Sequence, residues 1–101
     1  MARLLLQSGG YDVVGEAGSA AEAIASARAL EPELVLLDVL LPDGNGAEVA
    51  TDLAALPHPP GVVLTSSHRQ GGMGSRLSTV PVLGFVAKDD LTVARLDELF
   101  G

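Results

Sequence analysis

Two kinds of apolar spacing alternate along the chain, and turn signals separate them. Runs of Val and Leu without polar interruption predict strands that are buried on both faces. Segments with apolar residues three or four positions apart predict helices. The predicted strands cover residues 12–17, 33–39, 62–66 and 84–88, and the predicted helices cover residues 20–30, 46–56, about 73–77 and a last segment capped by Asp90 or Thr92.

Start and stop signals support this division of the chain. Ser19 and Glu22 have the spacing of a capping box, and Pro32 closes the helix that they begin. Strand and helix then follow each other in one rhythm, which predicts right-handed crossovers and a parallel sheet with helices on both faces. The expected fold class is therefore α/β, in a single domain that spans residues 1–101.

Composition narrows the classes of function. The chain has 48% apolar and only 3% aromatic residues, so the core must be aliphatic. A net charge of -7 argues against direct binding of nucleic acid, which needs clustered Lys and Arg. The absence of cysteine excludes disulfides and thiol chemistry. Without an apolar span of membrane length or a signal peptide, we expect no membrane partner and a cytoplasmic location.

Three of the predicted strands finish in groups that suit phosphoryl chemistry: Asp38, then Thr65 and Ser66, then Lys88. The carboxyl ends of parallel strands share one edge of a sheet, so these groups should meet there. A carboxylate can attack a phosphoryl donor, a hydroxyl can donate to a phosphoryl oxygen, and a lysine can neutralise the developing charge. Such a transfer also favours Mg²⁺ between the carboxylate and phosphoryl oxygens.

Each of these residues alone also has an ordinary structural explanation. Asp38 can cap the turn that follows it, Lys88 can be a solvated strand-end lysine, and Phe85 can simply fill space in the core. Asp43, inside the Pro-Asp-Gly turn, is interpreted as a turn residue rather than a ligand. The functional interpretation depends on these residues occurring together.

Their combination resembles the receiver domains of two-component response regulators. Residues 35–46 resemble the phosphoacceptor strand and turn of that family, residues 64–66 its switch-hydroxyl strand, and residues 84–88 its aromatic-switch and lysine strand. Asp38 and Ser66 are 28 positions apart, and Ser66 and Lys88 are 22 apart. Both spacings are typical of receivers that precede helix-turn-helix output domains.

The resemblance implies a flavodoxin-like, doubly wound parallel sheet and a role for each motif residue. Asp38 would accept a phosphoryl group from a histidine kinase, Lys88 would contact the phosphate, and Phe85 would report phosphorylation to the outer face. The backbone carbonyl of Leu40 would join Asp38 as a ligand of Mg²⁺. For the switch hydroxyl we prefer Ser66 to Thr65 because of its spacing to Lys88, although strand alternation allows only one of them to face the site.

The beginning of the chain departs from the family pattern. Receivers start with a strand that occupies the middle of the sheet and ends in an adjacent acidic pair that binds the metal, and neither is present here. We interpret the first residues as the later part of the first helix, so the domain would be truncated at its N-terminus. Either the start has been assigned too late, or the chain is a truncated receiver with an incomplete metal site.

Two other functions remain open. A pseudo-receiver would bind a partner through its last strand and helix without phosphorylation, and the missing acidic pair favours it. A small hydrolase or phosphatase would use Asp38 as nucleophile, but no second Asp lies two residues further on to act as an acid. Our preferred interpretation is a signalling switch rather than an enzyme, with a histidine kinase and either a second copy or an output protein as partners.

Overall fold

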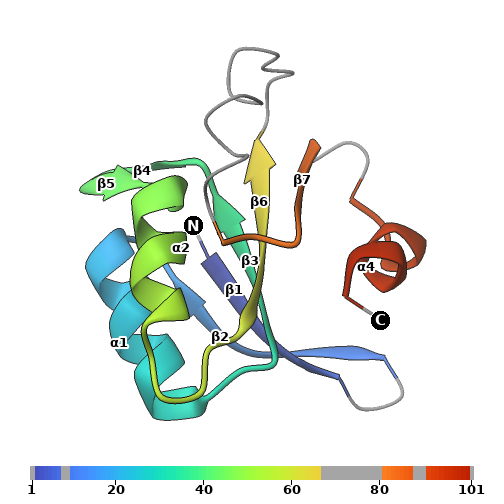
Figure 1. The fold of residues 1–101 in the computed structure, drawn as a ribbon, viewed down its shortest axis with the longest axis horizontal. Coiled ribbons are helices and arrows are strands. Elements are labelled where there is room, and N and C mark those ends of the chain that lie inside the picture. The colour runs from blue at the N-terminus through green and yellow to red at the C-terminus, as the bar shows by residue number, and fades with distance from the viewer. Residues whose placement is uncertain (1, 8–9, 67–80, 88–90, 101) are drawn as a thin grey trace.

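The computed structural model describes residues 2–7, 10–66, 81–87 and 91–100 as a five-stranded mixed sheet with helices on both faces (Figure 1). The strands of the sheet, in spatial order, are β2 (Tyr11–Ala17), β1 (Ala2–Gln7), β3 (Leu34–Asp38), β6 (Gly61–Ser66) and β7 (Gly84–Ala87). The helices are α1 (Ala20–Leu30), α2 (Gly46–Ala54) and α4 (Val93–Leu99). The α/β, flavodoxin-like class expected from the sequence is confirmed.

The parallel half of the sheet follows the sequence-based expectation closely. β3 pairs in parallel with β6, and β6 pairs in parallel with β7. Both faces of β3 are covered, since its first four residues are all buried. An uninterrupted Leu-Val-Leu-Leu run suits such a position because neither face is left to solvent.

The N-terminal segment is a strand, and the expectation of a helix remnant there is wrong. β1 lies between β2 and β3 and runs antiparallel to both, with Ala2 opposite Ala17 on one side and opposite Leu37 on the other. Its Leu4 and Leu5 point to opposite faces, and both are buried. β1 therefore supplies hydrogen-bond partners to both neighbours in the central position where a gap was expected.

Two apolar clusters fill the space between the sheet and its helices. One packs α1 and α2 against one face through Ala23, Ala27, Val49 and Leu53. The other packs Leu96 of α4 against the opposite face. Figure 1 shows this separation, with α1 and α2 on one side of the strands and α4 on the other.

Side-chain caps define the helix starts. The oxygens of Ser19, Asn45 and Thr92 accept hydrogen bonds from backbone N–H groups three residues ahead. Thr92 thus takes the position for which the sequence offered two candidates. The helix expected at about residues 73–77 lies outside the described residues. A two-stranded hairpin, β4 (Leu40–Leu41) with β5 (Gly44–Asn45), was not foreseen.

Candidate functional site

The carboxyl ends of β3 and β6 bring Asp38 and Thr65 together. The two residues are partners in the parallel register, and the Thr65 hydroxyl donates a hydrogen bond to Asp38 Oδ1 at 2.9 Å. Thr65 is only 3% exposed, whereas Asp38 is half-buried. Asp38 thus lies at the carboxyl edge of the sheet with part of its surface exposed, where an incoming group can reach it.

This geometry favours Thr65 over Ser66 as the hydroxyl beside Asp38. Strand alternation places Thr65 and Ser66 on opposite faces of β6, and Thr65 faces the carboxylate. Ser66 is half-buried and pairs in register with Ala87. The preference for Ser66 came from a residue count across residues 67–87, and a count of that kind changes with loop length, whereas strand register does not.

The backbone around Asp38 is held tightly by its neighbours. The N–H of Val39 donates to the Thr65 carbonyl at 2.9 Å, and the N–H of Gly46 donates to the Val39 carbonyl at 2.7 Å. A Cβ at Gly46 would lie 2.5 Å from the Asp38 carbonyl oxygen and 2.9 Å from a methyl carbon of Leu64. Only glycine allows α2 to begin this close to the phosphoacceptor strand predicted from the sequence.

Of the other predicted site residues, the structure describes Phe85 and Leu40 but not Lys88. Phe85 is half-buried, pairs in register with Leu64 and packs against the cluster beneath α1 and α2. Leu40 belongs to β4, and its side chain is 78% exposed. Lys88 lies outside the described residues, although Ala87, the residue before it, is the partner of Ser66 at the same end of the sheet.

The described residues supply few ligands for a metal ion. Receiver domains generally bind Mg²⁺ at their acidic phosphorylation site. Within residues 2–7, 10–66, 81–87 and 91–100, no three Asp, Glu, His or Cys side chains lie close enough to share an ion. The Asp38 carboxylate and the Leu40 carbonyl would supply two ligands of an octahedral shell, and Mg²⁺ usually fills the other positions with water and phosphoryl oxygens.

Asp43 is a residue whose contacts sequence reasoning missed. Its carboxylate accepts hydrogen bonds from the N–H groups of Ala20 at 2.7 Å and Ala21 at 3.2 Å. These backbone hydrogen bonds, that of Ala20 first, hold the pKa of Asp43 below its ordinary value. The sequence signal was an acidic residue inside a turn, which does not reveal that the partner is a helix start 23 positions earlier.

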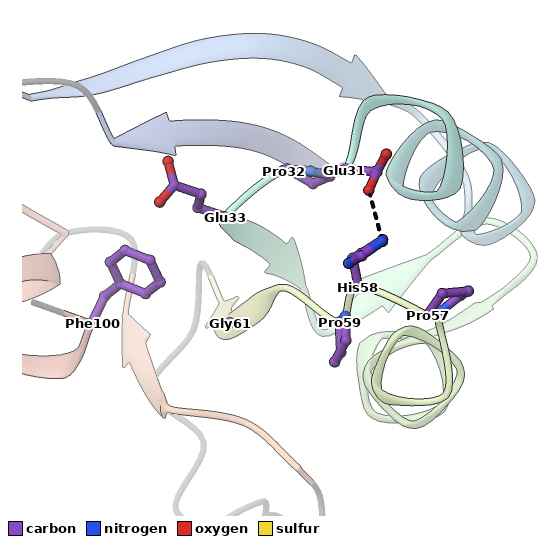
Figure 2. Close-up of a pocket in the computed structure, with 8 residues that line it drawn as sticks. All are labelled: Glu31, Pro32, Glu33, Pro57, His58, Pro59, Gly61 and Phe100. Carbon is purple, nitrogen blue, oxygen red and sulfur yellow. Dashed lines mark ion pairs between the residues drawn. The ribbon is translucent and has the colours of Figure 1, made fainter.

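An open pocket lies at the opposite edge of the sheet. His58 Nε2 lies 3.4 Å from a carboxylate oxygen of Glu31 there. Figure 2 shows this pair, with Phe100 on the other side of the opening. Glu33 and Gly61 place this pocket at the amino ends of β3 and β6, away from Asp38. It contains no predicted site residue; its lining consists of Glu31, Pro32, Glu33, Pro57, His58, Pro59, Gly61 and Phe100.

Comparison with known families agrees with this fold. The family model described as the response regulator receiver domain matches residues 1–98. The chain belongs to the response regulator receiver domain family. Receiver domains are signalling switches and not classical enzymes.

The curated relatives of this receiver domain include two bacterial regulatory proteins. It is 44% identical over 79 residues to the transcriptional activator DevR/DosR of Mycobacterium tuberculosis, covering 77% of this chain and 36% of the relative. It is 30% identical to the regulatory protein PdtaR of the same species, covering 94% of this chain and 51% of the relative. The receiver thus spans about half or less of the length of these two relatives.

Solved structures agree with the fold. The signal receiver domain of NarL from M. tuberculosis has a TM-score of 0.76 and 32% identity, covering 89% of this chain and 76% of that one. The receiver domain of a modulated diguanylate cyclase from Desulfovibrio desulfuricans, described as an example of alternate folding, has a TM-score of 0.74 and 31% identity, covering 94% of this chain and 77% of that one. No described helix of the present receiver has the length and apolarity needed to cross a bilayer.

Proposed function

We propose that this receiver accepts a phosphoryl group from a histidine kinase on Asp38 and acts as a switch in a two-component pathway. The observation that carries the proposal is the hydrogen bond from the Thr65 hydroxyl to Asp38 at the carboxyl edge of the sheet. This edge is where parallel α/β sheets gather their ligand chemistry. The role implies a cytoplasmic location, where the kinase would present its phosphohistidine.

In the proposed reaction, a carboxylate oxygen of Asp38 attacks the phosphorus of the phosphohistidine. The phosphorus–nitrogen bond breaks, its electron pair stays on the imidazole, and an acyl phosphate forms on Asp38. The Thr65 hydroxyl, which already holds one carboxylate oxygen, can then donate to a phosphoryl oxygen. Lys88 would offset the added negative charge, and Mg²⁺, when bound, would supply further charge neutralisation.

The switching surface would lie next to this site. Phe85 sits on β7 and packs against the α1 and α2 face, so movement of Thr65 toward a phosphoryl group can alter the packing of that strand. A change of this kind shifts a population between two arrangements of the surface. A homodimer partner or an output protein would recognise the shifted arrangement.

The test is phosphorylation of the full chain by acetyl phosphate in a buffer that contains Mg²⁺, followed by intact mass measurement. The wild-type chain should gain one phosphoryl group, and Asp38→Asn should gain none, because an amide is not a nucleophile under these conditions. Asp52→Asn makes the same change on the exposed side of α2 and should behave like the wild type. An Asp38→Asn chain that is modified as fast as the wild type would exclude Asp38.

A phosphorylation-independent interaction domain is the second candidate. It is favoured by the sparse metal ligands among the described residues and by β1, which contains no acidic residue. Under this alternative, Asp38→Asn would bind the partner protein and signal like the wild type. Loss of signalling with intact folding would instead support the switch.

A further inference from the structure

The hairpin that follows Asp38 is attached to a distant part of the chain through Asp43. The carboxylate of Asp43 accepts hydrogen bonds from Ala20 at 2.7 Å and from Ala21 at 3.2 Å, one on each oxygen. Ala20 and Ala21 are the first two residues of α1, where backbone N–H groups have no partner inside the helix. Asp43 therefore completes the cap that Ser19 begins through its bond to Glu22.

The residue after Asp43 also lies beside the helix start. A Cβ built on Gly44 would come within 3.7 Å of the Cβ of Ala20, so the hairpin tip and α1 are close neighbours. The helix start favours a negative charge, because its exposed N–H groups carry partial positive charge. The hairpin tip is thus held by two hydrogen bonds and by a favourable charge interaction.

The base of the same segment is fixed at Asp38 itself. Val39 donates to the carbonyl of Thr65, and Gly46 donates to the carbonyl of Val39. Between these points β4 and β5 pair as a hairpin, with Leu40 opposite Asn45. The base of residues 39–46 is therefore attached beside Asp38 and Thr65, and their tip at Asp43 is attached to α1.

We propose that Asp43 is a positioning residue for phosphoryl transfer to Asp38, a role that rests on the proposed function. By holding the hairpin tip on α1, it keeps the backbone that follows Asp38 in one conformation before the phosphoryl donor arrives. Fixing this backbone beforehand removes an entropic cost from the reaction. Asp43 does not contact the reacting atoms in this role.

The experiment compares four full-length variants in phosphorylation by acetyl phosphate with Mg²⁺ in the buffer. Asp43→Asn leaves only one acceptor oxygen. The rate should fall by about tenfold, at the lower end of the losses that follow when a residue orienting a metal ligand is replaced. Asp43→Glu keeps both oxygens on a longer arm and should recover part of the rate. Ser19→Ala removes the other cap of the same helix without touching the hairpin, and Asp52→Asn changes charge alone; neither should slow the reaction.

A second readout separates positioning from simple loss of stability. The two variants are compared under conditions in which their urea midpoints are equal. Asp43→Asn should then shift the amide resonances of Val39 and Leu40, whereas Ser19→Ala should shift only those of α1. Equal rates for Asp43→Asn and the wild type would overturn the positioning role, as would a Ser19→Ala chain that slows as much. If the wild type itself gains no phosphoryl group, the proposed function fails first, and the positioning role fails with it.

Discussion

β3 has two neighbours that run in opposite directions, and they contribute to the site in different ways. On the parallel side, β6 ends level with β3, so Thr65 meets Asp38 at the shared carboxyl edge. On the antiparallel side, β1 begins at that edge, with Ala2 opposite Leu37. Only the parallel side delivers a polar strand end to Asp38, so filling a sheet position and completing a site are separate requirements.

The largest change in stability should come from a core substitution in β1, on the antiparallel side of β3. Leu4 of β1 is fully buried, so Leu4→Ala should lower the free energy of unfolding by about 2–5 kcal/mol through lost burial and a cavity. Urea unfolding followed by circular dichroism would measure it. Leu40→Ala, at a side chain that is 78% exposed, is the matched control and should change stability by less than about 0.5 kcal/mol. Equal stabilities of the two variants would mean that β1 does not belong to the core.

The next effect tests the parallel side at the start of α2. Gly46→Ala should cost about 1–3 kcal/mol, because the new methyl group collides with the Asp38 carbonyl and with Leu64. Gly10→Ala is the control, since nothing lies within 4 Å of a Cβ there. Thermal unfolding of both variants would show the difference. A neutral Gly46→Ala would contradict the close approach of α2 to β3.

A smaller effect distinguishes the two hydroxyls of β6. Thr65→Val removes the donor to Asp38 with little change in shape, and phosphorylation by acetyl phosphate should slow about tenfold, which corresponds to about 1.4 kcal/mol. Ser66→Ala should leave the rate close to that of the wild type. Initial rates from intact mass measurements would decide. The opposite ranking would restore Ser66 as the switch hydroxyl.

The smallest effect concerns the contact between Tyr11, at the start of β2, and Asp97 of α4. The Tyr11 hydroxyl donates to Asp97 at 2.6 Å, and this hydrogen bond, followed by desolvation and the Asp97 charge, raises the pKa of Tyr11 above its ordinary value of 10.0. A raised pKa means stability that is complete below the ordinary value and is lost as pH rises through the folded value.

Urea midpoints between neutral and alkaline pH would test this contact. The wild-type midpoint should fall at alkaline pH, and Tyr11→Phe should show a smaller fall because its ring cannot ionise. The ring contact of Tyr11 with Phe100, 6.5 Å between centroids, should survive the substitution. Identical pH profiles for the two chains would argue against the hydrogen bond.

Local signals in the sequence were sufficient for most of the elements. The capping pair of Ser19 and Glu22 predicted the start of α1, and the unbroken apolar run predicted β3 within one residue at each end. The pattern failed at β1, where Leu4, Leu5 and Leu6 in succession carry no period that separates a strand from a helix. Its assignment depended on two neighbours that both required hydrogen-bond partners.

The sequence by itself determined an aliphatic α/β domain with Asp38 at a strand end, because burial patterns, caps and turns are written in residues close together along the chain. Only the tertiary structure decided that Thr65 faces Asp38, that β1 runs antiparallel in the centre of the sheet, and that Asp43 caps α1. These three features depend on strand register and on contacts between distant residues, such as the hydrogen bonds that span 23 positions to Asp43 and 27 positions to Asp38. Such contacts form only when the whole sheet has been assembled.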